Sequence, residues 1–473
     1  MTVAIDRQPV ASALAPRTVF LIFALALTGA LAIVVYVVPL NANDFLQHLL
    51  YFETHPFSIT FIRQWLEERT SSSDWRPLQY TIAHLLYFVA RGHEHLVFKG
   101  LLSISVAATG WLLWRLMLVQ NWREAVAAMT GFMILFAHHS FAGAVEAVYP
   151  YGVEIILVIC ELYVLGVLIL GRPSYASGAA VIAVSVFAIL LNEKGGLVGM
   201  TYLVGAALRM PGGSRRAAAM VFALYLAIVV LRFGYLTSPL SLIQRSGTHS
   251  VGENTFDFVA PALNVLISDP RFGKFRTFPQ AFVWGHPWAI VTVASSLTTL
   301  AVILAWAART FDRKTMSTEL KVGVILVAMV AGSMMFGPFS QKDYIPIMAL
   351  PAYALVTFYA IRWLLAQRAG AIAGAALVAG FILFAGWSIR TAGLFYYMHR
   401  TAYDYYDEWA LVGERHARFH EYPRLVGMPI LERLRAEATQ RRFTYTDYLM
   451  PEWAPYWLRG RGCPEFCGKY DKQ

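Results

Sequence analysis

Long apolar runs separated by short polar segments are the feature of this sequence that most restricts its fold. The first run, 18–38, is longer than a signal-peptide core and lacks a clear cleavage site, so we expect a retained helix. Only 14% of the residues are charged, whereas soluble domains carry roughly 25%. Runs of this length can cross about 30 Å of hydrocarbon as helices. The sequence therefore predicts an all-α polytopic membrane protein.

The net charge of +10 comes largely from basic residues in short loops between apolar runs, where such residues set membrane topology. This placement argues against a nucleic-acid partner and makes membrane lipids the expected surroundings. The sequence contains no GxxxxGK[ST] phosphate loop, no HExxH pattern and no dinucleotide fingerprint. An ATP-driven pump is therefore not expected.

The apolar runs give the predicted number of spans, about eleven. They lie near residues 18–38, 97–118, 124–141, 152–170, 175–191, 195–208, 217–236, 288–308, 320–339, 344–366 and 371–396. One further segment, 78–90, is apolar but short for a span. Whether this segment crosses the bilayer decides the sidedness of everything after it.

The positive-inside rule, applied to the basic residues between the runs, indicates whether segment 78–90 crosses the bilayer. If 78–90 does not cross and the N-terminus is cytoplasmic, the basic clusters fall in cytoplasmic loops. If 78–90 crosses, every cluster moves outside. We therefore expect this segment to lie at the interface or to dip in part-way. The clusters comprise Arg115, Arg123, Arg172, Arg209, Arg215, Arg216, Arg309, Arg313, Lys314, Arg362 and Arg368.

This threading predicts a transmembrane domain over 1–396 and a small external C-terminal portion over 397–473, rich in tyrosine and tryptophan. The transmembrane domain has a first external loop, 39–96, and a large external loop, 237–287. In the C-terminal portion, Cys463 and Cys467 can form a disulfide only outside the cytoplasm, and two unpaired thiols are the alternative.

Two acidic residues stand at the predicted outer ends of spans. Asp44 follows the first run, and Glu146 lies in a turn that also contains His139 and Tyr149. Each carboxylate has an ordinary interpretation, hydration at the membrane surface, and a functional one. The two interpretations have similar weight for Glu146, whereas hydration is favoured for Asp44 taken alone.

Charged residues also lie where loops are short or should be poor in cations. Glu193 and Lys194 separate two apolar runs with almost no loop, which predicts either an ion pair in a turn or a polar cavity lining. Arg76 stands at the start of the short apolar segment. The large external loop carries a basic cluster that is either solvated or a phosphate site, formed by Arg271, Lys274 and Arg276.

Acids and cations together beside lipid suit chemistry on a lipid-borne phosphate. A carboxylate can act as general base on an acceptor hydroxyl, while cations stabilise the departing phosphate. The residues alone do not identify the substrate.

Three stretches carry a resemblance to a known family. They are Asn43-Asp44-Phe45, then Trp75-Arg76-Pro77-Leu78 with Tyr87-Phe88, Gly92-His93 and His95, and finally His139 with Glu146-Ala147-Val148-Tyr149. In order, spacing and sidedness over about residues 18–210, they resemble the GT-C superfamily of polyprenyl-phosphate-sugar-dependent glycosyltransferases. The nearest likeness is to the branch with O-mannosyltransferases of the TMTC type and their bacterial relatives.

The resemblance implies a GT-C-like fold with interfacial helices in the first external loop and a periplasmic C-terminal portion. It implies that Asp44 is the general base and that Glu146 positions the acceptor or a metal. No cofactor follows from the motifs, and a divalent metal stays open. The chain departs from the family in reading Glu193-Lys194 where Lys-Glu is common, and in lacking tetratricopeptide repeats.

These expectations combine into an inverting glycosyltransferase of a bacterial inner membrane. It would transfer a sugar from a polyprenyl-phosphate donor to a glycan, lipid or protein hydroxyl on the periplasmic face. The candidates to hold the lipid phosphate are Arg76, Lys194 and the cluster Arg271, Lys274 and Arg276. The further substrate-binding candidates are Glu193, His139 and Tyr149. The rival is a transporter or flippase of a lipid-linked or anionic solute, for which Glu154 and Glu161 on one predicted helix face are the best evidence. A non-enzymatic subunit of a glycan assembly machine is the third alternative.

Overall fold

The computed structural model describes part of the chain, and all regular elements in that part are helices. The described residues are 15–37, 58–60, 76–90, 94–136, 138, 140–141, 144, 151–231, 265–266, 287–312, 315–334 and 345–367. The predicted all-α class is confirmed over these ranges. The predicted C-terminal portion, 397–473, with Cys463 and Cys467, and most of the loop 237–287 lie outside them.

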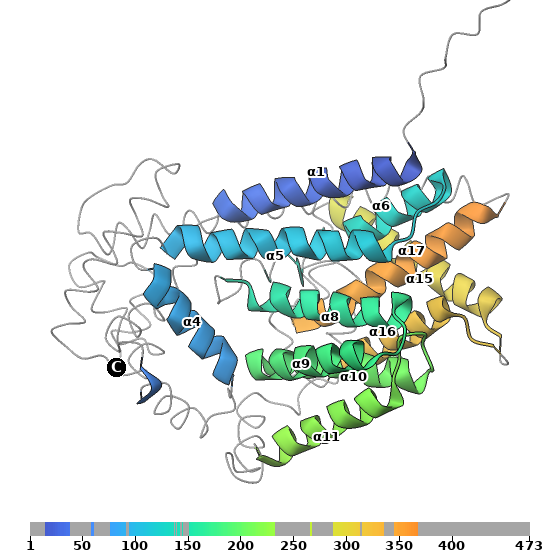
Figure 1. The fold of residues 1–473 in the computed structure, drawn as a ribbon. Helices are drawn as coiled ribbons and strands as arrows, with labels where there is room; N and C mark the ends of the chain where they lie inside the picture. Colours follow the sequence, from blue (N-terminus) through green and yellow to red (C-terminus); the bar gives the residue numbers. More distant parts are fainter. Residues whose placement is uncertain are drawn as a thin grey trace, which may run out of the picture.

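The described helices follow the predicted apolar runs closely (Figure 1). They are α1 (Pro16–Val37), α4 (Pro77–Ala90), α5 (Glu94–Leu116), α6 (Trp122–Phe136), α8 (Val153–Leu170), α9 (Tyr175–Leu191), η1 (Glu193–Gly195), α10 (Gly196–Ala207), α11 (Arg215–Leu231), α15 (Pro287–Thr310), α16 (Thr318–Met334), η6 (Ile345–Ala349) and α17 (Leu350–Ala366). The run predicted at 371–396 lies outside the described residues.

Four helical segments in this part are long and apolar enough to cross a membrane: Pro16–Ile33, Leu96–Leu116, Val153–Leu170 and Ile347–Ala366. Each coincides with one of the predicted spans. The other described spans are also helical, and most of their helices are shorter. The twelve-residue α10, for example, extends only about 18 Å at 1.5 Å per residue. The apolar helices indicate a membrane protein.

The outward faces of the peripheral helices are apolar, as expected for contact with lipid. On α11, Met220, Phe222, Leu226 and Val230 are each more than half exposed. Large exposed apolar surfaces on one helix are rare in soluble monomers. This exposure is consistent with a membrane environment around the bundle.

Close helix packing forms the centre of the bundle. Helices α6 and α17 pack tightly because Gly131 has no side chain: a Cβ there would lie 2.6 Å from the backbone oxygen of Ala354. Helices α1 and α5 approach in the same way at Gly110, which faces Thr28. Small residues at helix contacts are typical of membrane bundles, where close van der Waals packing replaces the hydrophobic effect.

The two ends of the bundle differ in charge. The turns α5–α6, α8–α9 and α10–α11 lie together at one end (Figure 1), and they carry most of the arginines predicted to share a side. We call this the arginine-rich end. There Arg362 of α17 contacts Glu319 of α16 at 3.2 Å and Glu124 of α6 at 3.9 Å. The turns predicted to share one side therefore lie together at one end of the bundle.

Helix α4 lies obliquely near the opposite end of the bundle, against α5 and α9 (Figure 1). It begins with Pro77 at its first position, where the missing N–H costs nothing. Its buried residues recur every three or four positions, so one face packs on the bundle. Its opposite face exposes Phe88 and Val89. At 14 residues, or about 21 Å, it is too short to span, as predicted for 78–90.

Candidate functional site

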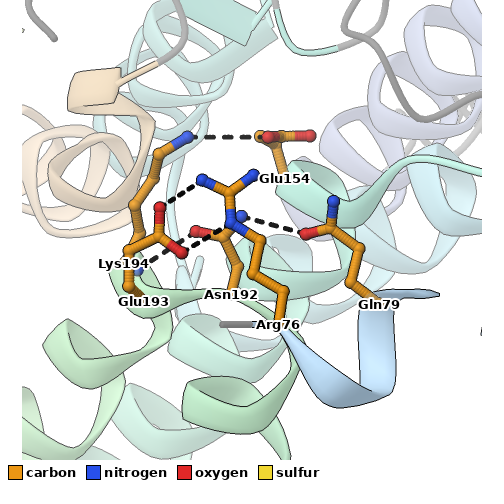
Figure 2. A network of polar contacts seen from close by, with 6 residues as sticks. All are labelled: Arg76, Gln79, Glu154, Asn192, Glu193 and Lys194. Carbon is orange, nitrogen blue, oxygen red and sulfur yellow. Dashed lines mark hydrogen bonds and ion pairs between the residues drawn. The ribbon is translucent and has the colours of Figure 1, made fainter. Parts of the chain in front are cut away.

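A cluster of charged and amide side chains lies where α4, the start of α8 and the turn between α9 and α10 meet (Figure 2). We call it the Arg76 network; its members are Arg76, Gln79, Glu154, Asn192, Glu193 and Lys194. Since α9 runs away from the arginine-rich end and α10 returns to it, the turn 192–195 lies at the opposite end.

Arg76 and Glu193 form the more open pair of the network. The Nε of Arg76 donates to Oε2 of Glu193 at 2.6 Å, and its Nη2 donates to Oε1. A planar guanidinium matches the two oxygens of a carboxylate in this two-pronged geometry. The contact joins residues far apart in sequence, so it fastens the start of α4 to the α9–α10 turn.

Lys194 and Glu154 form the second, more deeply buried pair. Their Nζ and Oε1 atoms lie 3.5 Å apart, and their side chains are only 7% and 4% exposed. Burying two charges is costly unless they compensate one another. Arg76 and Lys194 each take part in at least one further interaction.

Two amides connect the network to the backbone. The backbone N–H of Lys194 donates to Oδ1 of Asn192 at 3.1 Å, and Nδ2 of Asn192 donates to Oε1 of Gln79 at 3.1 Å. Gln79 and Asn192 are both almost fully buried. The amides therefore hold α4 and the α9–α10 turn in a fixed register.

Tyr151 closes the cluster from the side of α8. Its hydroxyl donates to the backbone oxygen of Gln79 at 2.7 Å. Burial, and after it the nearby Glu154 carboxylate, raise the pKa of Tyr151 well above its usual value. The phenol therefore stays protonated at physiological pH and is a constant hydrogen-bond donor.

The tight α9–α10 turn explains why charges lie so close to the apolar helices. Asn192 ends α9 in an extended conformation and caps η1 through its side chain. Gly195 follows because a Cβ at this position would lie 2.0 Å from the backbone oxygen of Ala188. The turn thus reverses the chain within a few residues and leaves no room for a longer, solvated loop.

A second buried acid lies deeper along α8. Glu161 is fully buried and accepts a hydrogen bond from Thr201 of α10 at 2.6 Å. The same Thr201 hydroxyl lies 3.1 Å from the sulfur of Met329 on α16. Glu154 and Glu161 therefore share the face of α8 that packs toward η1 and α10, as their spacing predicts.

The structure brings together the predicted site residues that it describes. Arg76, Glu193 and Lys194 meet in one network, and Glu154 joins them. Each of the neighbours Glu193 and Lys194 has an ion-pair partner distant in sequence, Arg76 for Glu193 and Glu154 for Lys194. The charge of Lys194 also helps to lower the pKa of Glu193. Adjacent side chains on a tight turn diverge, so each reaches a different neighbouring helix.

The remaining predicted site residues lie outside the described residues: Asp44, His139, Glu146, Tyr149, Arg271, Lys274 and Arg276. In the part of the chain that the structure describes, no three His, Cys, Asp or Glu side chains form a metal-binding group. A metal that depends on Asp44 and Glu146 is therefore untested.

Gln79, Asn192 and Tyr151 are site residues that sequence reasoning missed. A signal for two of them existed. Gln79 is a polar residue in a short apolar segment, and Asn192 directly precedes two charges at the end of an apolar run. Tyr151 gave no signal, since a tyrosine at the end of a span is commonly an interfacial anchor.

The Arg76–Glu193 pair is expected to persist across physiological pH. Burial alone would raise the pKa of Glu193, but the Arg76 guanidinium outweighs it and lowers the pKa to about 2. A depressed carboxyl pKa stabilises the fold above the unfolded value, near 4.5, and that stabilisation is lost as pH falls toward 2. The stability difference between the wild type and Glu193→Gln should stay constant from pH 8 to about 5 and shrink below it.

Thermal unfolding of both proteins in detergent across that pH range measures this difference. A difference that changes between pH 5 and 8 would show that Arg76 does not hold the Glu193 carboxylate in its charged form.

Comparisons of the whole chain with protein-family profiles, with curated proteins and with solved structures give no match.

Proposed function

We propose that this protein is a GT-C-type inverting glycosyltransferase that uses a polyprenyl-phosphate sugar. In this proposal the chain crosses a bacterial inner membrane eleven times. The reaction centre lies on the periplasmic face. The observation that carries the proposal is the Arg76 network. It joins Arg76, at the start of α4, to the Glu193-Lys194 turn at one end of the apolar bundle. In sequence, Arg76 belongs to the Trp75-Arg76-Pro77-Leu78 motif.

Charged groups at a membrane boundary are costly, and they commonly mark functional sites. Four charges gather here, at the end opposite the arginine-rich turns. By the positive-inside rule, the arginine-rich end is the cytoplasmic one, which supports an external site at the network. Both predicted acids connect to this end in sequence, since Asp44 follows the end of α1 and Glu146 precedes α8.

In the proposed reaction the acceptor hydroxyl oxygen attacks the anomeric carbon of the donor. The bond from that carbon to the phosphate oxygen breaks, and the polyprenyl phosphate leaves with the electron pair. Asp44 takes the hydroxyl proton as general base. The configuration at the anomeric carbon inverts because attack and departure occur on opposite faces.

Arg76 and Lys194 each have a carboxylate partner, so the four charges of the two pairs sum to zero. A phosphate bound there must share or displace Glu193 or Glu154. The basic cluster Arg271, Lys274 and Arg276 has three cations and one acid close by in sequence, Asp269, so it keeps an excess of positive charge and is the better candidate to hold the lipid phosphate. The role proposed for the Arg76 network is to hold α4 in place beside the substrate.

Sugar transfer in proteoliposomes tests the proposal. Purified protein is incubated with radiolabelled undecaprenyl-phosphate sugars and with a panel of glycan, lipid and peptide acceptors. We expect label to reach an acceptor from a lipid-phosphate donor and not from a nucleotide sugar. Absence of transfer from every donor, together with protein-dependent movement of a lipid or solute across the bilayer, would contradict it.

A transporter is the second candidate, because Glu161 is fully buried far from either end of α8. Its Oε2 has no hydrogen-bond partner in the described part of the chain. Buried acids in spans often belong to proton or ion pathways. Glu161→Gln separates the candidates: it should abolish transport by a transporter and leave sugar transfer by an enzyme largely intact.

A further inference from the structure

Two buried polar atoms of the Arg76 network have no hydrogen-bond partner in the described part of the chain. They are Nε2 of Gln79, a donor, and Oε2 of Glu154, an acceptor. Gln79 is fully buried and Glu154 is 3% exposed. An unsatisfied buried polar atom costs about 1–3 kcal/mol, and each one in a folded protein needs an explanation.

The identity of the Gln79 donor follows from its neighbours. The backbone N–H of Lys194 can only donate, so the atom of Asn192 that it contacts must be the oxygen. The other amide atom of Asn192 is therefore nitrogen, and it needs an oxygen on Gln79. This chain of contacts fixes Nε2 as the remaining Gln79 atom, so the assignment does not depend on an arbitrary amide flip.

The same contacts hold the two unpartnered atoms in one neighbourhood. Glu154 binds Lys194, Lys194 holds Asn192, and Asn192 holds Gln79. Tyr151, three residues before Glu154, binds the backbone of Gln79 and closes the loop of contacts. Figure 2 shows the Gln79 amide nitrogen directed away from Asn192, toward the side of the network where Glu154 lies. Neither side chain can turn to another partner without breaking one of these contacts.

A donor and an anionic acceptor facing one neighbourhood select for a particular ligand group. A phosphate would be repelled by the Glu154 carboxylate, and an ammonium group would have no acceptor at Gln79. A hydroxyl fits both, since it donates one hydrogen bond and accepts others. Hydrogen bonds to a charged partner are the stronger ones.

We propose that Gln79 and Glu154 bind one hydroxyl group of the carbohydrate substrate, which donates to Glu154 and accepts from Gln79. That the ligand is a carbohydrate rests on the proposed glycosyltransferase function, whereas its hydroxyl group is inferred from the two side chains. The hydroxyl belongs either to the sugar of the lipid-phosphate donor or to the acceptor. The site selects which sugar binds and in which orientation, apart from the chemistry at Asp44.

Binding of deoxygenated probes tests this site in nanodiscs. The donor probes are undecaprenyl-phosphate glucose and mannose, their monodeoxy analogues, and bare undecaprenyl phosphate. The acceptor probes are octyl glucoside and octyl mannoside with their monodeoxy analogues. The proteins are the wild type, Gln79→Met, Glu154→Gln and a matched control, Gln120→Met, which changes a glutamine at the arginine-rich end.

We expect one deoxy position to weaken binding to the wild type and to Gln120→Met by about ten-fold, as for one hydrogen bond to a charged group. In Glu154→Gln the penalty for the same analogue should fall well below ten-fold, because a neutral amide oxygen replaces the charged acceptor. In Gln79→Met the penalty should also fall, but less, because the Glu154 carboxylate still accepts from the hydroxyl. A penalty found on donor probes assigns the hydroxyl to the donor sugar, and one found on the octyl glycosides assigns it to the acceptor.

The comparison of parent and deoxy probes on the wild-type protein needs no variant, so it tests the site even if Gln79→Met folds poorly. The inference is overturned if no probe binds the wild type, or if every monodeoxy analogue binds as tightly as its parent, which would leave a water as the partner of both atoms. Sugar transfer measured on the same preparations reports separately on the enzyme. Transfer without any deoxy penalty keeps the proposed function and removes the hydroxyl site.

Discussion

Lys194→Met is expected to lower the free energy of unfolding by about 3–5 kcal/mol, because it leaves the Glu154 carboxylate buried without its cation. Lys194 and Glu154 contact each other at 3.5 Å with side chains only 7% and 4% exposed, so water cannot replace the lost partner. Methionine keeps the length of the aliphatic stem, and the change isolates the charge. Unfolding in a mixed-micelle denaturant titration measures the loss.

Lys321→Met is the matched control. Lys321 on α16 donates to the backbone oxygen of Arg209 at 3.2 Å in an exposed position. Exposed contacts of this kind contribute less than about 1 kcal/mol, so the control should change stability little. Similar losses in Lys194→Met and Lys321→Met would contradict the claim that burial makes the Lys194–Glu154 pair important.

The double variant Lys194→Met/Glu154→Leu is a second check on the same pair. Removing both charges eliminates the unpaired carboxylate, and replacing a buried ion pair by apolar groups is often neutral or stabilising. We therefore expect the double variant to recover much of the stability lost in Lys194→Met. Additive losses would mean that the two side chains act independently.

The overall fold could be predicted from the sequence wherever one physical rule dominates. Apolar run length predicted the helices, and the predicted run 152–170 coincides with α8 (Val153–Leu170). The positive-inside rule predicted that 78–90 does not span, and α4 is short and oblique. The length of the helix in the predicted span 195–208 was harder to predict, because a short helix after a tight turn has the same hydropathy as a helix that crosses the membrane completely.

The site could be predicted only in part. Charged residues close to lipid are energetically costly and commonly functional, and this principle identified Arg76, Glu193 and Lys194 as candidates. Partner choice depends on the packing of α4 against α9, which hydropathy does not encode. The sequence left a turn ion pair of Glu193 with Lys194 and a polar cavity lining as alternatives, and it did not predict the observed pairs, Arg76 with Glu193 and Glu154 with Lys194. Neutral partners such as Gln79 carry still less signal.

The arrangement of the network limits what chemistry its members can perform. Glu193 is held by the Arg76 guanidinium with a pKa of about 2, so it is a weak base at neutral pH. The Glu154 carboxylate is balanced by Lys194. A carboxylate that acts as general base must accept a proton readily, and a cation paired with it opposes protonation. We therefore propose that the base is an acid outside the network, Asp44 first.

Asp44→Asn is expected to lower the rate of sugar transfer by about 10²–10⁴-fold, the range for removal of a general base. Asparagine has the shape of aspartate but cannot take the proton from the acceptor hydroxyl. Binding of the lipid-phosphate donor should change by less than about three-fold, because donor binding does not require the base. Transfer kinetics and donor binding are measured on the same proteoliposome preparations.

Asp312→Asn is the matched control for this change. Asp312 is an exposed residue after the last turn of α15, where it accepts a hydrogen bond from Thr315 at 2.6 Å. The Asp312→Asn variant should transfer sugar at the wild-type rate. If Asp44→Asn also retains full transfer, the base is elsewhere, and Glu146→Gln becomes the decisive variant. A loss of both transfer and donor binding in Asp44→Asn would instead indicate that Asp44 shapes the donor site, because loss of the proton acceptor alone lowers the rate and leaves donor affinity unchanged.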